Sequence, residues 1–489
     1  MKTPEENRTI RGERNKDFDG APIKTVIMAG GVGSRIQEIE SELPKPLIKI
    51  KSKPILQYEL ECLAAQGFTE IIITVAHKSK MIMDYFGDGG QFGCSISYYE
   101  EKTPLGNAGA LFKLWDSGKL EDGSDFLLLN ADAMFDVDFR RFVDFHRSHG
   151  GLATLFTHPN SHPFDSGLII TSSDHSGSVE MWLTKEDERP KYYKNRVNAG
   201  LHVVNTAVLQ RAIEKGINKE YIGQKDSKSG KVIKVDLDRQ LLKPLAGSGL
   251  LFAYDSPEYV KDMGTPKRFT QVTKDLNSGL VSARNLNVPQ KAIFLDRDGT
   301  INRFVGFLRD PQSFELLPGV SEAIELINQS GFLCIVITNQ PVIARGEVTE
   351  EGLQTIHDKM ETILGQAGAY IDALYYCPHH PDKGFVGEIT ELKTECNCRK
   401  PKPGLLLQAA RDYNINLKNS WMIGDGWRDI EAGKNAGTHT ALLTGEGTEN
   451  YMIADQVEGH MREATPDIEA SDLLGAVKKI LHYYESGGG

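Results

Sequence analysis

Apolar runs of strand length alternate along the first half of the chain with stretches of helical apolar periodicity. Residues 25–29 (TVIMA) and 71–76 (IIITVA) are almost uninterrupted apolar runs. Leu56, Leu60 and Leu63 recur at the spacing of one helix face. Because strands and helices alternate, we predict a parallel sheet with helices on both of its faces.

The same alternation restarts in the second half of the chain. Residues 292–295, 332–337 and 421–423 are further apolar runs, and residues 320–327 carry a helical apolar stripe. Residues 473–481 form an amphipathic pattern that predicts a final helix. This half is therefore also predicted to be an open α/β sheet.

We expect two tandem three-layer α/β domains. The length of 489 residues agrees with this division, because hydrophobic cores rarely grow beyond about 250–300 residues. The first domain is predicted at residues 22–284 and the second at 291–484, joined by a short linker at 285–290. Residues 1–21 are polar and non-periodic and are expected to form a flexible lead-in.

Composition narrows the class of protein. Hydrophobic residues make up 40% and charged residues 25% of the chain, which is typical of a globular protein. With 56 Lys+Arg against 67 Asp+Glu, the formal charge of −11 argues against a nucleic-acid or membrane-surface binder. The chain has no apolar run of transmembrane length, and its charged beginning is unlike a signal peptide. We therefore expect a cytoplasmic protein, with its oligomeric state left open.

A glycine-rich turn follows the first predicted strand. The turn AGGVGSR at residues 29–35 allows backbone N–H groups to approach an anion, and Arg35 adds a fork of donors. Ten residues later, two prolines stiffen the loop that carries Lys45, a compact charge suited to a triphosphate. Each feature alone also fits an ordinary turn, but together they predict a phosphate site.

Two aspartates are candidates for a magnesium site in this half. Asp132 follows the apolar run 126–129, and Asp262 lies in a DMGTP segment much later in the chain. Ligands of open α/β sheets bind at the carboxyl ends of the strands. Two carboxylates together with phosphates are a common way to hold Mg²⁺, although a single aspartate after a strand is more often a helix cap.

The string GGVGSR followed by PKPL resembles the signature of sugar nucleotidyltransferases, and most closely their mannose-1-phosphate guanylyltransferase-like branch. Further matching segments are YFGDG at 85–89, EKTPLGNAG at 101–109, ERP at 188–190, NAG at 198–200 and DMGTP at 262–266. The resemblance covers about residues 22–284. It departs from the family at Arg189, where lysine is common, and at Ala131, where glycine usually precedes the aspartate.

This resemblance implies transfer of a nucleotidyl group from an NTP to a sugar 1-phosphate, without a covalent intermediate. Arg35 and Lys45 would act on the triphosphate, and Asp132 and Asp262 would hold Mg²⁺. The nucleotide would be bound by Gly30, Gly31, Gly33, Ser34, Glu101 and Gly106, and the sugar phosphate by Glu188, Arg189, Asn198 and Gly200.

The second half carries a different acidic motif. The segment DRDGT at 296–300 begins where a predicted strand ends, and its two carboxylates, Asp296 and Asp298, could serve as nucleophile and general acid/base. Thr338 and Asp425 also follow predicted strands, and Lys400 leads into a helix. An Asx-turn would explain the first motif alone, but the four pieces together predict one converging site.

Three cysteines and a histidine are grouped in this half. The pair Cys377 and His379 is followed, after sixteen intervening residues, by Cys396 and Cys398. Four such ligands in C-x-H and C-x-C spacing suit a closed, tetrahedral Zn²⁺ site that clamps a loop. The sequence therefore predicts a structural zinc, against the alternative of cytosolic thiols that lie close together by coincidence.

These motifs resemble the haloacid dehalogenase superfamily of phosphatases. Within it, DRDGTIN, TNQ, IARG, YYCPHHP and CNCRKPKPG resemble the D-glycero-D-manno-heptose 1,7-bisphosphate 7-phosphatases over about residues 291–448, with histidinol phosphatase as the nearest alternative. By this resemblance Asp296 is the nucleophile and Asp298 the acid/base. Mg²⁺ would be held by Asp296, Asp298 (through its main-chain carbonyl) and Asp425, and the phosphoryl group by Thr338, Asn339, Arg399 and Lys400.

Together the two resemblances imply a bifunctional enzyme. Removal of the 7-phosphate would leave heptose 1-phosphate, the acceptor for a nucleotidyltransferase with GTP as the expected donor. The product would be a GDP-heptose for lipopolysaccharide or S-layer glycans. Two alternatives remain open at this stage: a nucleotide-sensing, non-catalytic first domain, and a phosphatase for histidinol phosphate or another sugar phosphate.

Overall fold

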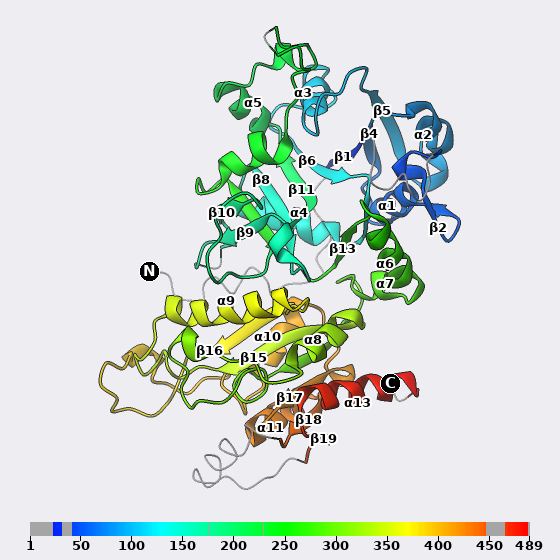
Figure 1. Ribbon diagram of the computed structural model, residues 1–489. Coiled ribbons are helices and arrows are strands. Elements are labelled where there is room, and N and C mark those ends of the chain that lie inside the picture. The colour runs from blue at the N-terminus through cyan, green and yellow to red at the C-terminus, as the bar shows by residue number, and fades with distance from the viewer. Residues whose placement is uncertain (1–22, 32–41, 175, 228, 446–464, 488–489) are drawn as a thin grey trace.

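The computed structural model describes residues 23–31, 42–174, 176–227, 229–445 and 465–487, and Figure 1 shows two α/β bodies stacked along one axis. The predicted lead-in at residues 1–21 lies outside the described residues. No helix within the described ranges is long and apolar enough to cross a membrane.

The first body is built on a large mixed sheet. Among the described residues, nine strands form it, with β10, β9, β11, β6, β1, β4 and β5 in order and β8 and β12 branching from β11. These strands are β1 (Lys24–Ala29), β4 (Glu70–Val75), β5 (Ser95–Glu100), β6 (Asp125–Asn130), β8 (Ala153–His158), β9 (Leu168–Thr171), β10 (Val179–Leu183), β11 (Val197–Asn205) and β12 (Leu251–Asp255).

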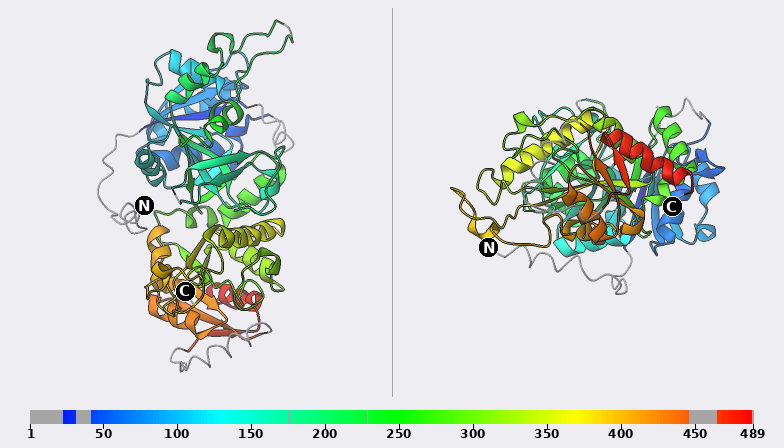
Figure 2. Two further views of the ribbon diagram at one scale, coloured as in Figure 1. Left: turned by 90° about the vertical axis from the view of Figure 1, so that its left-hand side faces the viewer. Right: turned by 90° about the horizontal axis from the view of Figure 1, so that it is seen from below.

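Helices cover both faces of this sheet (Figures 1 and 2). The helices are α1 (Ile55–Ala64), α2 (Ser79–Phe86), α3 (Gly109–Asp116), α4 (Phe139–His149), α5 (Ala207–Glu214), α6 (Pro266–Asn277) and α7 (Leu280–Ala283). Two short strand pairs flank the sheet: β2 (Lys49–Ile50) with β3 (Lys53–Pro54), and β7 (Ala133–Asp136) with β13 (Tyr259–Asp262).

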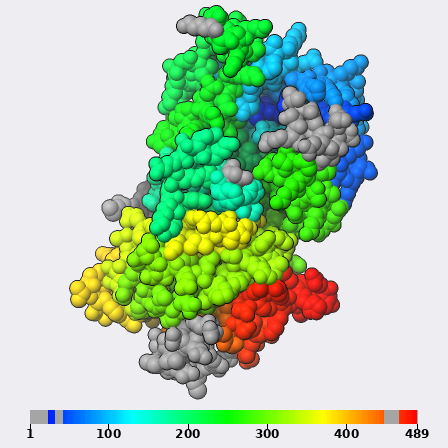
Figure 3. Space-filling model, viewed as in Figure 1, coloured from blue at the N-terminus to red at the C-terminus, as the bar shows by residue number. Residues whose placement is uncertain are grey.

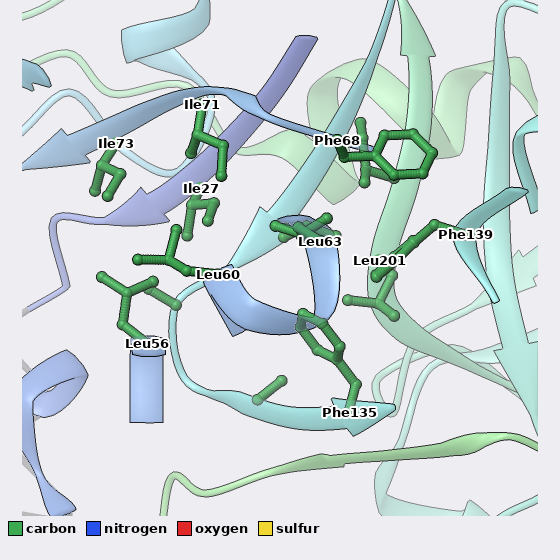
Figure 4. Packing of buried hydrophobic residues seen from close by; sticks show 14 of the residues in the cluster. Ile27, Leu56, Leu60, Leu63, Phe68, Ile71, Ile73, Phe135, Phe139 and Leu201 are labelled. Atoms are coloured by element: carbon green, nitrogen blue, oxygen red, sulfur yellow. The ribbon is translucent and has the colours of Figure 1, made fainter. Parts of the chain in front are cut away.

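Alternation along the central strand produces two hydrophobic layers. Ile27 of β1 faces a cluster with Leu56, Leu60 and Leu63 of α1, shown in Figure 4, whereas Val26 belongs to the cluster on the opposite face. Side chains of a strand point alternately to the two faces of a sheet, so one buried strand contributes to both layers. The predicted helix face and strands are therefore confirmed.

The prediction of a parallel sheet holds for only part of the first body. Strands β5, β4, β1 and β6 are parallel, but β11 runs antiparallel to β6 and β8, and β9 and β10 form an antiparallel pair. A parallel connection needs a long crossover, usually a helix. Residues 159–196, which lead from β8 through β9 and β10 to β11, contain no α-helix in their described part, so antiparallel pairing follows.

The second body has a six-stranded sheet that is parallel throughout the described residues. Its order is β16 (Ala373–Cys377), β15 (Phe332–Asn339), β14 (Lys291–Leu295), β17 (Trp421–Gly424), β18 (His439–Leu443) and β19 (Ile468–Ala470). The helices around it are α8 (Val320–Gln329), α9 (Glu350–Gln366), α10 (Gly404–Asp412), α11 (Trp427–Ala436) and α13 (Leu473–Glu485). The three-layer α/β class is thus confirmed for both bodies.

The segment between the two sheets is held against both of them. Leu286 donates its backbone N–H to Glu258 of the first body, at 3.0 Å, and Gln290 donates to the Asn414 carbonyl of the second, at 2.8 Å. Just before this segment, Arg284 forms a buried ion pair with Asp372, at 3.0 Å. The predicted linker therefore forms part of a polar, ordered junction between the bodies.

Two candidate active sites and a cysteine–histidine cluster

The second body gathers its acidic residues at the carboxyl edge of the sheet. Asp296 follows β14, Asp425 follows β17, and Asp429 lies in the first turn of α11. One carboxylate oxygen from each of the three lies within 4.8 Å of the others, and all three residues are buried. Parallel strands end at the same edge, and the predicted meeting of Asp296 with Asp425 follows from that topology.

Lys400 lies between two of these carboxylates. Its Nζ is 2.7 Å from Asp296 Oδ1 and 2.6 Å from Asp429 Oδ1, and it donates to the Ile337 carbonyl at 2.8 Å. Burial lowers the pKa of Lys400, but the two carboxylates raise it by more, so the group stays charged. Asn339 donates to the Lys400 carbonyl and accepts from its N–H, which fixes the backbone beneath the ammonium.

The cluster carries more negative than positive charge. Burial and the neighbouring Asp429 raise the pKa of Asp296 to about 7 against the lowering effect of Lys400. Burial, Asp296 and Asp429 raise the pKa of Asp425 well above its usual range, and among the described residues neither Asp425 oxygen has a hydrogen-bond partner. Three buried carboxylates around one ammonium leave oxygens and charge that fit a divalent cation such as Mg²⁺.

Asp298 is oriented by a ring of donors beside this cluster. The buried Arg297 guanidinium lies 2.8 Å from Asp298 Oδ2, and the side-chain amides of Asn302 and Gln340 donate to the same carboxylate at 3.0 and 2.9 Å. Gln340 also donates to the Thr338 hydroxyl at 2.8 Å. Asp298 is therefore a fixed carboxylate that faces the same strand ends as Asp296.

The predicted zinc ligands come together as one cluster. Cys377, His379, Cys396 and Cys398 present ligand atoms within 4.8 Å of one another. The Sγ–Sγ separations are 3.0 to 3.5 Å, and His379 Nδ1 is 3.3 Å from Cys398 Sγ. Hydrogen bonding to the other two thiols raises the pKa of Cys377, whereas that of Cys396 is lowered by the same contacts. Three sulfurs and one imidazole nitrogen fit a tetrahedral Zn²⁺.

The cysteine–histidine cluster is directly connected to the phosphatase-like site. Cys398 lies two residues before Lys400, and the intervening Arg399 donates to the His379 carbonyl at 3.4 Å. Arg399, predicted to contact the phosphoryl group, therefore makes at least one contact that ties the loop together. The cysteine–histidine loop and the buried Lys400 are therefore connected both along the chain and by this hydrogen bond.

In the first body, one predicted magnesium ligand, Asp262, ends β13, and the other, Asp132, directly precedes the strand β7 that pairs with it. Asp262 ends β13 and is in register with Ala133 of β7, the residue after Asp132; in addition, Met263 N–H donates to the Asp132 carbonyl at 2.9 Å. Lys45 Nζ is 2.6 Å from Asp132 Oδ2, and Arg268 Nη1 is 2.7 Å from Asp262 Oδ2. The backbones of the two aspartates are thus adjacent, and each carboxylate pairs with a different basic side chain.

Among the predicted nucleotide-binding residues that the structure describes, Gly30 and Glu101 lie at the same edge, after β1 and β5. Gly30 follows β1, and a Cβ there would be 2.9 Å from Glu101 Oε1, so the carboxylate is packed closely against the loop. Burial raises the pKa of Glu101, although it accepts from Leu105 N–H. Gly106 has φ of +84°, and a Cβ there would be 2.3 Å from the Val235 carbonyl. Gly31 is described, whereas Gly33, Ser34 and Arg35 lie outside the described residues.

The predicted sugar-phosphate residues divide into two groups. Asn198 and Gly200 lie on β11 beside the end of β6: Asn130 Nδ2 donates to the Gly200 carbonyl at 3.4 Å, and Gly200 N–H donates to Asn198 at 3.1 Å. Glu188 is exposed. Arg189 donates to the carbonyls of Pro163 and Ser166, so its fork supports a loop next to β11.

Two site residues were not predicted from the sequence. Asp429 lies four residues after Asp425, and the pattern D-x-x-x-D at the start of a helix was the available signal. Glu59 is buried on α1, where burial and the nearby Asp132 raise its pKa well above the usual range. It falls three residues after Leu56 and four before Leu63, so the periodicity that predicted the helix face also placed this carboxyl inside.

Comparison with known proteins assigns each half separately. The nucleotidyl transferase family model matches residues 24–279, and a HAD hydrolase-like model matches residues 397–474. The second half is 38% identical over 183 residues to the D-glycero-beta-D-manno-heptose-1,7-bisphosphate 7-phosphatase of Yersinia pestis, covering 37% of this chain and 95% of that protein. For the enzyme of the same name from Vibrio cholerae the identity is 41% over 192 residues, with 39% and 95% covered.

A solved structure is also similar to this half. The D,D-heptose 1.7-bisphosphate phosphatase from B. bronchiseptica, complexed with magnesium and phosphate, is 35% identical, covers 40% of this chain and 99% of its own, and has a TM-score of 0.33.

The fold and the two acidic sites thus define a two-domain enzyme that joins a nucleotidyltransferase to a phosphatase. The chain belongs to the nucleotidyl transferase family, and its second half belongs to the family of D-glycero-beta-D-manno-heptose-1,7-bisphosphate 7-phosphatases.

Proposed function

We propose that the chain carries out two consecutive steps in the formation of a nucleotide-activated heptose. The second domain would hydrolyse the 7-phosphate of D-glycero-D-manno-heptose 1,7-bisphosphate. The first would transfer NMP, with GTP as the expected donor, to heptose 1-phosphate and release pyrophosphate. The observation that carries the proposal is the buried cluster of Asp296, Lys400, Asp425 and Asp429, in a domain that matches heptose phosphatases over 95% of their length.

In the phosphatase step, Asp296 is the nucleophile. Its carboxylate oxygen attacks the 7-phosphorus, the sugar oxygen leaves, and Asp298 donates the proton that this oxygen takes up. Asp298 then removes a proton from the water that attacks the aspartyl-phosphate, which releases phosphate and restores Asp296. Lys400, held by Asn339 and two carboxylates, neutralises charge on the transferring group.

A divalent cation in this site would neutralise negative charge of the carboxylates and of the phosphoryl group. Asp296, Asp425 and Asp429 are the side chains placed to hold it. The contribution of Asp298 that the family resemblance implies is its main-chain carbonyl. Its carboxylate is oriented by Arg297, Asn302 and Gln340. The cysteine–histidine cluster would hold Zn²⁺ and keep the Lys400 loop in place.

In the transferase step, a sugar 1-phosphate oxygen attacks the α-phosphorus in line and pyrophosphate leaves. This reaction needs positioning and charge stabilisation rather than a covalent intermediate. Lys45 lies beside Asp132 and would meet the triphosphate, together with Arg35. Asn198 and Gly200 would hold the sugar phosphate beside the end of β6. Asp132 and Asp262 would hold Mg²⁺, which would neutralise negative charge on the triphosphate.

Several finer assignments belong to the same proposal. GTP is supported by the resemblance of the first domain to guanylyltransferases, and heptose by the names of the two relatives above, neither of which is a histidinol phosphatase. A cytoplasmic location and a role in lipopolysaccharide or S-layer glycan formation follow from the product. The reaction itself requires no nucleic acid or membrane.

The direct test is one incubation of D-glycero-D-manno-heptose 1,7-bisphosphate with each of the four common NTPs, analysed by mass spectrometry. We expect phosphate, pyrophosphate and a GDP-heptose in the GTP reaction. Release of phosphate without any nucleotide sugar, together with NTP binding, would contradict catalysis by the first domain. Faster hydrolysis of histidinol phosphate in a parallel panel would contradict the heptose assignment.

A pair of reciprocal variants tests the division of labour. Asp296→Asn should abolish phosphate release while pyrophosphate release from heptose 1-phosphate and GTP continues, because the nucleophile belongs to the second domain only. Asp132→Asn should show the opposite pattern. Both activities are measured on the full chain, and loss of both in a folded Asp296→Asn protein would refute the assignment.

A further inference from the structure

Helix α9 of the phosphatase domain presents two neighbouring faces. Ile356, Met360 and Leu364 pack into the core of the second body, whereas the adjacent stripe contacts groups outside that core. That stripe consists of His357, Glu361 and Gly365, spaced four residues apart. Glu361 and Gly365 contact the first body, whereas His357 contacts Arg297 of the second body. Figures 1 and 3 show this helix, in yellow, directly beneath the first body.

The helix binds backbone groups of the transferase. Tyr193 N–H donates to the Thr362 hydroxyl at 2.9 Å, and the same hydroxyl lies 3.2 Å from the Tyr193 carbonyl. Asn195 N–H donates to Glu361 Oε2 at 3.0 Å. Three contacts from two adjacent residues of α9 therefore fix the chain immediately before β11.

Arg196 strengthens this attachment with a buried charge. Its guanidinium donates to Glu361 Oε2 at 3.1 Å and to the Asp372 carbonyl at 3.0 Å, both in the second body. Within the first body, Arg196 Nε donates to Asp255 Oδ1 at 2.6 Å. Both Arg196 and Glu361 are buried, so removal of Arg196 would leave the Glu361 carboxylate without its guanidinium partner away from water, whereas removal of Glu361 would leave Arg196 paired with Asp255 alone.

The attached segment runs directly into the proposed sugar-phosphate site. Asn198 and Gly200 follow Arg196 by two and four residues on β11. A second part of the same region also rests on α9: a Cβ at Gly365 would lie 2.8 Å from Pro163 Cγ, and the Pro163 carbonyl accepts from Arg189. Two segments beside the site are thus supported by a helix of the other domain.

We propose that α9 holds the sugar-phosphate site of the transferase in its working geometry, with Glu361 and Arg196 as positioning residues. The inference rests on the proposed function in one respect, the assignment of Asn198 and Gly200 to the sugar phosphate. The phosphatase domain is then a structural component of the transferase site as well as a separate catalyst.

The test uses Glu361→Ala and Glu361→Gln in the full chain. Glutamine keeps a side-chain oxygen that can accept from Asn195 N–H but loses the charge that faces Arg196. The KM for heptose 1-phosphate should rise roughly 10- to 100-fold in Glu361→Ala and less in Glu361→Gln, because small displacements of binding groups have effects of this size. The KM for GTP and the phosphatase kcat/KM should remain within about twofold of the wild-type values.

The matched control is Glu351→Gln, at an exposed glutamate on the same helix. This variant should keep the wild-type KM for heptose 1-phosphate, KM for GTP and phosphatase kcat/KM. His357 is avoided because its ring contacts Arg297 at 3.1 Å, next to the phosphatase acid/base. Equal rises in both KM values, or no rise in a folded Glu361→Ala protein, would overturn the inference.

A readout independent of turnover separates this inference from the proposed function. Amide hydrogen exchange over residues 193–200 should be faster in Glu361→Ala than in wild type, with no change over 125–130 of β6. Unchanged exchange over 193–200 would refute the positioning role. If exchange is faster in Glu361→Ala but the wild-type protein does not use heptose 1-phosphate, the positioning role of α9 is supported and the assignment of heptose 1-phosphate as substrate is wrong.

Discussion

The Lys400 ammonium lies between the buried carboxylates of Asp296 and Asp429, and Asp429 is the partner that was not predicted from the sequence. Asp429 lies 2.6 Å from the Lys400 ammonium and also accepts from the Gly426 N–H. Asp429 therefore helps to orient the Lys400 side chain and also offers one carboxylate oxygen to the candidate cation site.

Asp429→Asn should therefore lower phosphatase kcat by roughly 100-fold or more, because the lysine loses a charged anchor and the cation a charged ligand. Pyrophosphate release by the first domain should stay unchanged. Glu431→Gln on the same helix is the control. The measurement is phosphatase kcat from a phosphate-release assay with saturating Mg²⁺. A wild-type kcat in Asp429→Asn would show that Asp296 and Asp425 are sufficient for phosphatase activity without the Asp429 charge.

His202 gives a residue-scale prediction about stability. The side chain is buried on β11, neither ring nitrogen has a hydrogen-bond partner within the described ranges, and burial lowers the pKa of His202 to about 3. The ordinary pKa of about 6.5 applies in the unfolded chain. Below pH 6.5 the unfolded state binds the extra proton, so the free energy of unfolding falls by about 1.4 kcal/mol per pH unit down to about pH 3.

His202→Phe should remove this slope, and the difference between variant and wild type in urea unfolding at pH 7, 6 and 5 measures it. The comparison matters because other buried groups titrate in the same window, such as Glu258, whose pKa burial raises to about 7. His482→Phe, at a side chain that is 80% exposed, is the control and should keep the wild-type slope.

Residue-level prediction succeeded where local pattern and topology agreed. Asp296 and Asp425 were predicted to meet because each follows an apolar run, and ends of parallel strands converge. Arg196 had no comparable signal: its partner Glu361 is 165 residues away, and a lone arginine before a strand is ordinarily an exposed residue. An ion pair between residues this far apart in the sequence depends on how the two folded domains pack against each other. Local hydrophobic periodicity carries no information about that packing.

At the scale of elements, the cysteine–histidine loop leads directly into Lys400, which the proposal places in the phosphatase site. The loop that begins at Cys377 at the end of β16 returns at Cys396 and Cys398, and Lys400 follows at once. The spacing of the four ligands was sufficient to predict the cluster. It did not predict that Asn339 would hold the backbone of Lys400, because that contact joins two loops.

Cys398→Ser should therefore lose one equivalent of zinc per chain and roughly 10- to 100-fold of phosphatase activity, because the Lys400 loop would lose its attachment and small displacements of a reacting group have effects of this size. Zinc content by elemental analysis and phosphate release are measured together. Cys62→Ser, at a half-buried thiol outside the cluster, should retain both. Full activity in a zinc-free Cys398→Ser protein would show that Lys400 does not depend on this attachment.

The direction of strand β11 could not be predicted from the hydrophobic pattern. The periodicity located β1, β4 and β6 correctly, and these are parallel neighbours. It did not reveal that β11 is antiparallel, because a buried strand has the same apolar run in either direction. The antiparallel entry of β11 nevertheless brings Gly200 beside Asn130 at the candidate site.

At the scale of the whole molecule, the two bodies share buried charges. Arg284 donates to Asp372 Oδ1 at 3.0 Å and to the Phe332 carbonyl at 2.9 Å, and Asp372 in turn accepts from Cys334 N–H. This ion pair and the Arg196–Glu361 pair cross the junction without access to water. Relative motion of the two bodies would require both pairs to be exposed or broken.

Arg284→Met should lower the stability of the junction by about 3–5 kcal/mol, the typical effect of leaving a buried charge without its partner. We expect one thermal transition for the wild-type protein and two separate transitions for the variant in scanning calorimetry. Arg303→Met, which breaks an ion pair of half-exposed or exposed side chains, should keep one transition. A single transition in both variants would mean that the bodies are coupled by other contacts.

The sequence separation of 165 between Arg196 and Glu361 also has a consequence during synthesis. A ribosome that adds 5–20 residues per second needs roughly 10–30 s to make the intervening chain. Once Asp255 has been made, the Arg196 guanidinium of the nascent first body can pair with it, but Glu361 of α9 is still missing. Nucleotidyl transfer would begin to work properly only once the helix has emerged from the exit tunnel, so premature termination after the first body would yield an impaired transferase.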